Sequence, residues 1–375
     1  MHICFIEDTH LHGGTQIWVT EANRAFLASG ADVTVLAPED SWVIQQCAQT
    51  DARLMTYDWD GVVRAEEEHV RIWTEALRPC DVAICTVHPP REGFHCSVFA
   101  AHCIKLGDLK THLIPKTGTI VPSYLREFYL PDESIRSSVI AIADFTRRYL
   151  VETYKIPEDL VSLIYQGTDI HTLTPSRKGK AEAIKRYPLP ESATPVLAYA
   201  GSFEHRKGLP VLLDAVFELA SGPLSDVHLM LVGDGPDEAM LRDHTRDMGI
   251  EANVTFFPFT REPKYIFERA DITVLSSTYK EGLPNILLES MAMHTPVVST
   301  NLGGVPEIVI DGETGYKVET ENSEHLAMAI QNLWSDQKAY RRMRKNARRL
   351  VEEKFDKERQ FKRFLEYFEA CISVP

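Results

Sequence analysis

The chain has 375 residues, of which 44% are hydrophobic and 25% charged, a balance typical of globular proteins. This length predicts two domains, each large enough to bury its own core. The formal net charge of −14 argues against nucleic acid as a partner, because nucleic-acid backbones are themselves anionic.

Targeting signals are not apparent. The first residues, His2 to Asp8, form a segment too short and too acidic for a signal peptide, and no apolar run approaches the roughly 20 residues needed to span a bilayer. The seven cysteines are scattered and include no CxxC pair, which favours a reducing compartment over a disulfide framework. We therefore expect a cytoplasmic protein.

The first half of the chain alternates between strand and helix patterns, with Gly13 and Gly14 in the first loop. Strands are predicted at residues 2–6, 32–36, 81–86, 111–114 and 139–143, and helices at 17–27 and 144–154. A strand, a helix and a second strand at the start of a chain predict a parallel sheet.

The second half repeats the pattern and ends in a helical tail. Its predicted strands are 196–200, 227–232, 254–257, 272–275 and 296–299, and its predicted helices are 209–219, 285–293 and 323–372. Two such α/β series, with glycine turns after strands, predict a pair of doubly wound domains whose ligands bind beyond the strand carboxyl ends. We assign an N-terminal domain to 1–175, a Pro-, Lys-, Ser- and Thr-rich linker to 172–194, a C-terminal domain to 195–355, and a helix to 356–375 that packs back toward the N-terminal domain.

The tail contains a basic stretch, residues 341–345. A solvated helix face is the favoured interpretation of such a charge run. Peripheral attachment to an anionic membrane surface, at the inner face of the membrane, is the alternative that we keep open.

The segment 279–289 carries the most chemical information. Glu281 and Glu289 lie on either side of Pro284, which suits a helix start because proline has no N–H to leave unpaired. Free backbone N–H groups around Leu283 and Asn285 can hold an anion. One carboxylate would then face a sugar and the other a ribose. An amphipathic helix with a capping acid fits the residues equally well.

This segment resembles the paired-glutamate motif of retaining glycosyltransferases of family four, whose GT-B fold has two Rossmann-like domains facing a central cleft. Five further blocks resemble family motifs, occur in the family's order and cover nearly the whole chain. They are Gly13-Gly14, 166–169, 201–208, 232–236 and 303–307.

The resemblance implies roles for the matching residues. Glu289 would accept hydrogen bonds from ribose hydroxyls, and Glu281 would orient the transferred sugar. Arg206 and Lys207 would bind the diphosphate, and the backbone of Gly14 would approach the same phosphates. Preorganised cations and N–H groups suit a leaving group that gains negative charge. The other donor-binding positions implied are Gly201, Ser202, Phe259 near the base, Leu283, Pro284 and Asn285.

The sequence departs from the family pattern at three places. Ser202 stands where the family often has arginine, and Pro258 interrupts the loop before Phe259. Lys116 aligns with the family histidine near the donor sugar. His88 and Thr117 are further candidates to contact the sugar or the acceptor, although a loop histidine without a role is the alternative for His88.

The sequence contains only weak matches to metal-binding motifs, and we expect neither a metal nor a cofactor. The nucleotide-sugar would be a co-substrate. Asp58-Trp59-Asp60 has the form of a DxD metal motif but lacks its strand context, which favours a solvated turn. His95-Cys96 and His102-Cys103 favour a partly buried helix over ligands, since cysteine is commonly buried.

We therefore expect a retaining, metal-independent hexosyltransferase of polysaccharide biosynthesis. It would move a hexose or N-acetylhexosamine from a nucleotide-diphosphate sugar, with UDP favoured, to a saccharide, lipid-linked or small-molecule acceptor that the sequence does not identify. The alternatives are a nucleotide-sugar epimerase or a phosphorylase on the same fold, and a catalytically inactive, donor-binding partner subunit.

Overall fold

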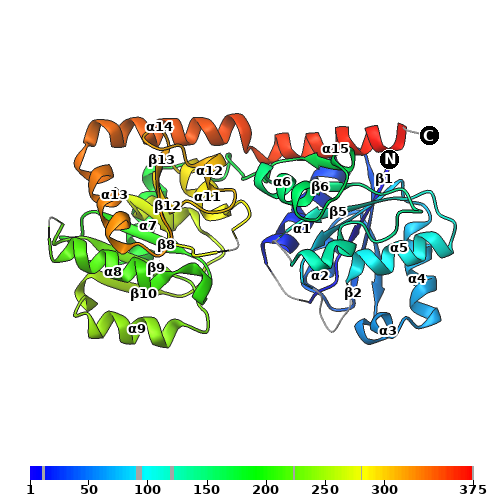
Figure 1. Ribbon diagram of the computed structural model, residues 1–375, viewed down its shortest axis with the longest axis horizontal. Helices are drawn as coiled ribbons and strands as arrows, with labels where there is room; N and C mark the ends of the chain where they lie inside the picture. The colour runs from blue at the N-terminus through cyan, green and yellow to red at the C-terminus, as the bar shows by residue number, and fades with distance from the viewer. Residues whose placement is uncertain (11–12, 90–94, 119–121, 223, 280, 374–375) are drawn as a thin grey trace. The chain divides into compact units, whose positions relative to one another are not determined.

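The computed structural model describes residues 1–10, 13–89, 95–118, 122–222, 224–279 and 281–373. Two compact units make up the chain (Figure 1): Met1–Tyr165 together with Arg359–Pro375, and Gln166–Glu358. Among the described residues, no helix has both the length and the apolar character needed to cross a bilayer.

The first unit is built on a seven-stranded parallel sheet in the order β3-β2-β1-β4-β5-β6-β7. Its strands are β1 (His2–Ile6), β2 (Asp32–Pro38), β3 (Arg53–Tyr57), β4 (Val82–Val87), β5 (His112–Thr117), β6 (Val139–Ala141) and β7 (Val161–Leu163). All five strands predicted for this half are confirmed, although β5 extends three residues beyond the predicted end at residue 114.

Helices cover both faces of this sheet because the side chains of each strand alternate between the two faces. In β1, Ile3 and Phe5 pack toward α1 and α2, while Cys4 and Ile6 pack toward α4 and α5. The helices of this unit are α1 (Gly14–Ala28), α2 (Trp42–Cys47), α3 (Trp59–Val63), α4 (Glu67–Leu77), α5 (Cys96–Leu106), α6 (Asp144–Glu152) and α15 (Lys357–Ser373).

The C-terminal helix α15, red in Figure 1, belongs to the core of the first unit from Arg359 onward. It buries Phe361, Phe364 and Phe368 in the same apolar cluster as Trp18 and Phe26 of α1. The Phe364 and Trp18 rings lie 5.1 Å apart between centroids. The two ends of the chain therefore share one hydrophobic core.

The second unit has a six-stranded parallel sheet in the order β10-β9-β8-β11-β12-β13. Its strands are β8 (Val196–Ala200), β9 (His228–Val232), β10 (Val254–Phe257), β11 (Ile272–Leu275), β12 (Val297–Thr300) and β13 (Gly315–Val318). The five strands predicted here are confirmed, and β13 is an additional edge strand. Both sheets are parallel throughout, as the doubly wound prediction requires.

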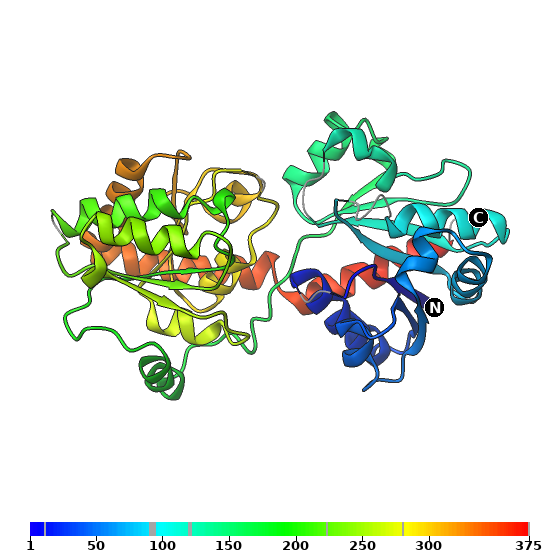
Figure 2. The same cartoon turned by 90° about the horizontal axis from the view of Figure 1, so that it is seen from below.

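Figure 2 shows the helices of the second unit on both faces of its sheet. One face carries α8, α9 and α13, and the other carries α7, α10, α11 and α14. These helices are α7 (Arg177–Arg186), α8 (Leu209–Ala220), α9 (Glu238–Asp247), α10 (Lys264–Arg269), α11 (Asn285–Ala292), α12 (Val305–Ile308), α13 (Ser323–Ser335) and α14 (Gln337–Lys354). The basic side chains Arg341, Arg342 and Lys345 of α14 are exposed; membrane attachment through them stays a prediction.

The boundary between the units differs from the linker expected at 172–194. The first unit ends at Tyr165, and the expected linker contains α7, which packs on α10 inside the second unit. The hydroxyl of Ser176 caps α7 by accepting a hydrogen bond from the N–H of Gly179. Helix capping and packing therefore order a segment whose composition resembles a linker.

The loop after β12 packs directly on the segment that follows β11. Gly304 donates its N–H to the carbonyl oxygen of Gly282 at 2.8 Å. Gly303 has a φ of +58°, and a Cβ at this position would overlap the carbonyl oxygen of Glu281. Only glycine satisfies both requirements, since other residues resist positive φ and carry a Cβ.

We expect Gly303→Ala to destabilise the second unit more than Gly312→Ala does. Both glycines have positive φ, but a Cβ on Gly312 meets open space. Gly312→Ala should therefore cost only the left-handed backbone penalty of about 1–2 kcal/mol, whereas Gly303→Ala adds the overlap with Glu281. Urea unfolding of the two variants measures the difference, and equal losses would contradict the close packing of these loops.

Candidate functional site

Both sheets reverse their winding direction at one pair of neighbouring strands. In the first unit these strands are β1 and β4, and in the second they are β8 and β11. The loops that follow such a pair diverge and leave room at the carboxyl edge, which is where open parallel sheets bind ligands. The motifs at 13–14, 201–208 and 279–289 follow three of these four strands, β1, β8 and β11 respectively.

In the second unit, the reversal brings Lys207 and Glu281 into contact. The Nζ atom of Lys207 lies 2.6 Å from Oε1 of Glu281, and Nη1 of Arg206 lies 3.6 Å from the same oxygen. The Glu281 side chain is 8% exposed and that of Lys207 13%. Two cations and one carboxylate predicted from separate motifs therefore form a single cluster.

Arg206 has a second acidic partner that the sequence analysis missed. Its Nε donates to Oε2 of Glu204 at 2.8 Å. Burial opposes ionisation of Glu204, but the hydrogen bond and charge of Arg206 hold the pKa of its carboxyl below the ordinary value. Glu204 thus orients Arg206, and the i to i+2 spacing of the two residues was the only sequence signal of the pair.

Glu281 is held from a second side by Ser277, whose hydroxyl donates to Oε1 at 2.6 Å. Four residues after Glu281, helix α11 begins, with Pro284 as its N-cap rather than its first helical residue. Pro284 makes no side-chain cap hydrogen bond to this helix start. The first N–H groups of a helix have no partner within the helix, which suits them to an anion.

The remaining donor-binding residues predicted in this unit lie around the same edge. Leu283 is buried, Asn285 is exposed and Glu289 is half-buried in α11. Phe259 is 56% exposed in the loop after β10. Lys280 lies outside the described residues.

The phosphate-loop glycines fix the course of the chain after β8. Gly201 donates its N–H to the carbonyl oxygen of Val232, and the carbonyl oxygen of Ser202 accepts the hydroxyl of Tyr199 at 2.8 Å. Gly208 has a φ of +59°, and a Cβ there would overlap the carbonyl oxygen of Ser276. This close approach brings the loop after β8 against the loop after β11.

In the first unit, Gly13 and Gly14 form the start of α1. Gly13 is the N-cap and makes no side-chain cap hydrogen bond. The first N–H groups of this 15-residue helix lie at the carboxyl edge of the sheet and have no partner within the helix. This arrangement suits the phosphate contact that the sequence implies for Gly14, which stays a prediction.

Lys116 lies inside β5 rather than in the loop after it, which corrects the shorter strand expected from the sequence. Its side chain is 3% exposed, and its Nζ lies 4.4 Å from the ring centroid of Trp18 in α1. Burial lowers the pKa of Lys116 to about 8, although the charge of nearby Glu7 opposes this shift. The ammonium therefore has partners within the protein.

His88 is also engaged within the first unit. Its Nε2 lies 2.6 Å from Oδ1 of Asp8, and its Nδ1 lies 2.6 Å from the carbonyl oxygen of Pro89. Burial is the largest influence on the pKa of Asp8 and raises it, but the hydrogen bond and charge of His88, with smaller contributions from His95 and Cys96, together lower that pKa. Both ring nitrogens of His88 are therefore engaged by oxygen atoms of the first unit.

Thr117 is buried, and its Oγ1 accepts the N–H of Ile142 at 3.0 Å. This hydrogen bond extends the pairing between β5 and β6. The sugar or acceptor contacts predicted for His88 and Thr117 stay predictions, and the structure gives each residue a partner of its own.

One cluster in the first unit has the composition of a metal site. Ligand-type atoms of Asp8, His95 and Cys96 lie within 4.8 Å of one another, and all three residues are buried. Asp8 already pairs with His88. Burial raises the pKa of the Cys96 thiol well above its ordinary value, which disfavours the thiolate that binds metals. In the DxD-like segment, Asp58 caps α3 by accepting the N–H of Gly61 at 2.9 Å.

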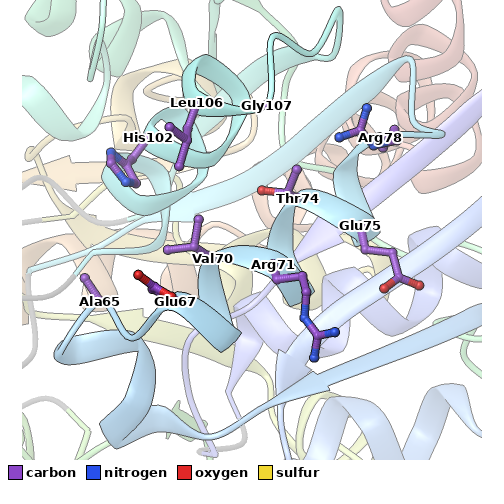
Figure 3. A pocket seen from close by; sticks show the side chains of 10 residues that line it. All are labelled: Ala65, Glu67, Val70, Arg71, Thr74, Glu75, Arg78, His102, Leu106 and Gly107. Carbon is purple, nitrogen blue, oxygen red and sulfur yellow. The ribbon is translucent and has the colours of Figure 1, made fainter.

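A groove of about 670 Å³ lies on the outer face of the first unit, between α4 and α5 (Figure 3). His102 and Leu106 of α5 face Val70 and Thr74 of α4 across it. None of the candidate site residues lines this groove. The helix predicted around 95–103 is confirmed as α5.

Comparison with known proteins identifies the second half of the chain. Residues 180–350 match the family model described as glycosyl transferases group 1. The lipopolysaccharide core biosynthesis glycosyltransferase LpsE of Rhizobium meliloti is 32% identical over 181 residues, 48% of this chain and 52% of that protein. D-inositol 3-phosphate glycosyltransferase of Corynebacterium diphtheriae is 32% identical over 195 residues, 50% of this chain and 45% of that protein. The chain thus matches about half the length of these relatives.

Solved structures match both units together. The Anabaena protein HepE in complex with UDP has a TM-score of 0.85 at 18% identity, with 99% of this chain and all of that chain covered. A glycosyltransferase of Rickettsia africae has a TM-score of 0.84 at 17% identity, with 100% and 99% covered. At this identity the likeness concerns the fold, and it confirms the GT-B class expected from the sequence. Residues 180–350 thus form a domain similar to the glycosyl transferases group 1.

Proposed function

We propose that the protein is a retaining, metal-independent glycosyltransferase that transfers a hexose or N-acetylhexosamine from a UDP-sugar. The observation that carries the proposal is the cluster of Arg206, Lys207 and Glu281 at the strand reversal of the group 1 domain. Cations beside a sugar-orienting carboxylate are what a nucleoside diphosphate leaving group requires. The UDP and UDP-glucose bound by HepE support this choice of donor.

The reaction follows from these roles. The bond between the anomeric carbon and the diphosphate oxygen breaks while Arg206 and Lys207 neutralise the charge that develops on the diphosphate. Glu281 orients the sugar as positive charge develops on its ring. The acceptor hydroxyl attacks the same face, its oxygen bonds to the anomeric carbon, and its proton passes to the departing phosphate oxygen.

Two measurements on the purified chain test the proposal. A thermal-shift screen against a panel of nucleotide-sugars identifies the donor, because a ligand that binds only the folded state raises the unfolding temperature. Hydrolysis or transfer of that donor then tests turnover. Donor binding without turnover would indicate an inactive partner subunit instead, and conversion of the donor to its epimer would indicate an epimerase.

We expect activity to be unaffected by a strong chelator of divalent metals. The side chains of Arg206 and Lys207 supply the positive charge that Mg²⁺ or Mn²⁺ supplies in metal-dependent transferases, and the first aspartate of the DxD-like segment is used as a helix cap. Turnover measured with and without EDTA checks this expectation. Loss of activity with EDTA, restored by Mn²⁺ or Mg²⁺, would show that the mechanism depends on a metal.

Glu289→Ala should weaken binding of UDP. A carboxylate that accepts ribose hydroxyls makes charge-assisted hydrogen bonds worth about 1.5–3 kcal/mol each, so the dissociation constant should rise at least about tenfold. Calorimetric titration with free UDP measures it. Glu324→Ala, at an exposed position of α13, is the matched control. Unchanged UDP affinity in the Glu289 variant would remove this residue from the ribose site.

The product should keep the anomeric configuration of the donor, and Glu281→Gln should lower turnover far more than donor affinity. The contact of Glu281 with the sugar matters most when charge develops in the transition state, so its loss should appear mainly in kcat. Proton coupling at the anomeric carbon of the product reports the configuration. A β-linked product from an α-linked donor would overturn the retaining mechanism.

A further inference from the structure

Lys116 is a buried cation in a place where packing alone would favour an apolar residue. In β5 it lies two residues after Ile114, on the sheet face that α1 covers. It is 3% exposed. Lysine is almost never fully buried without a partner, and so its surroundings indicate why it is there.

Two partners of Lys116 are tied to the first two turns of α1. Its ammonium lies 4.4 Å from the ring centroid of Trp18, within the range of a cation–π interaction. Its charge is also close enough to Glu7 for each to favour ionisation of the other. Glu7 accepts a hydrogen bond from Nε2 of Gln16 at 2.8 Å.

Glu7 itself is fixed to the sheet. It is 4% exposed, and its main-chain oxygen accepts the hydroxyl of Tyr57 at 2.6 Å. Gln16 and Trp18 follow Gly13 and Gly14 by two to five residues in α1. Two contacts from the sheet therefore hold the first turns of α1, which begin at Gly13 and Gly14. One contact is made by Glu7 to Gln16, and the other by Lys116 to Trp18.

We propose that Lys116 is a positioning residue that acts through Trp18 to hold the backbone N–H groups at the start of α1 in the place where they meet the donor diphosphate. The inference rests on the proposed function, since the predicted contact of Gly14 with a diphosphate requires a nucleotide-sugar donor. It replaces the idea that Lys116 itself contacts the donor sugar. A side chain that misplaces these N–H groups weakens every interaction they make with the diphosphate.

The ionisation of this cluster has a defined pH dependence. Burial raises the pKa of Glu7 to about 7, with Asp8 adding to the shift and Gln16, His88 and Lys116 opposing it. Burial lowers the pKa of Lys116 to about 8, with Glu7 and Cys85 opposing. Between about pH 8 and the ordinary lysine pKa of 10.5, the unfolded chain therefore keeps the Lys116 proton while the folded protein loses it. Because the unfolded state binds more protons in this range, the contribution of Lys116 to the free energy of unfolding increases with pH there.

A double-mutant cycle distinguishes action through Trp18 from direct contact with the donor. Lys116→Met and Trp18→Leu should each raise the dissociation constant of UDP or the donor KM between about tenfold and a hundredfold, and the double variant should be no worse than either single one. Trp18→Phe keeps an aromatic face and should retain most of the affinity. Lys110→Met, exposed just before β5, is the matched control. Additive effects of the two substitutions would overturn the proposal.

Hydrogen exchange of the unliganded protein tests the positioning role without reference to catalysis. Amides at the start of α1, residues 14–19, should exchange faster in Lys116→Met than in wild type or Lys110→Met. Normal exchange in a Lys116→Met variant that has lost donor affinity would overturn the proposal in favour of direct contact. Failure of wild type to bind any nucleotide-sugar would instead count against the proposed function, because the exchange result does not depend on it.

Stability against pH gives a third readout. Wild type should gain unfolding temperature relative to Lys116→Met as the pH rises above about 8. A constant difference between pH 7 and pH 10 would show that burial does not lower the pKa of Lys116 and would count against a desolvated ammonium beside Trp18.

Discussion

Parallel pairing of every strand is the constraint on which the sites depend. A parallel sheet forces each crossover to return over a face, so all loops that leave strand carboxyl ends emerge at one edge. Where the winding reverses, between β1 and β4 and between β8 and β11, adjacent loops part and expose backbone N–H groups. Lys207 and Glu281, 74 residues apart in sequence, meet at 2.6 Å because they follow the two strands of one such reversal.

The contact between Lys207 and Glu281 is more than a stabilising ion pair. Removing two charges from water costs several kcal/mol, so a buried pair is weak evidence for stability and is costly to break. The guanidinium of Arg206 and the hydroxyl of Ser277 contact the same carboxylate oxygen and hold it in place. Such a preorganised cluster needs no reorganisation when charge develops on a leaving group, which is the property that transition-state stabilisation demands.

Sequence patterns predicted most strands of both sheets, but they did not predict that Lys116 lies buried inside a strand of the first unit. The difference lies in whether burial leaves a local pattern in the sequence. Central strands such as β4 and β9 are apolar runs bounded by polar or glycine residues, and burial on both faces makes such runs easy to find. The short edge strands β7 and β13 lack that pattern, and α7 has the composition of a linker. Lys116 was assigned to a loop because its burial depends on Trp18 and Glu7, about 100 residues earlier, and no local pattern reports such a contact.

The histidines at the carboxyl edge of the first sheet are relevant to whether the proposed transfer retains or inverts the configuration of the sugar. An inverting mechanism needs a base that can accept the acceptor's proton, and histidine is the usual residue for this task. Both ring nitrogens of His88 are already engaged, one by Asp8 and one by the carbonyl oxygen of Pro89. His95, whose pKa burial lowers to about 4, uses Nδ1 to accept the N–H of Ser97 and is itself buried. These two histidines are therefore engaged within the first unit. Their engagement is compatible with the proposed mechanism, in which the departing phosphate takes the proton.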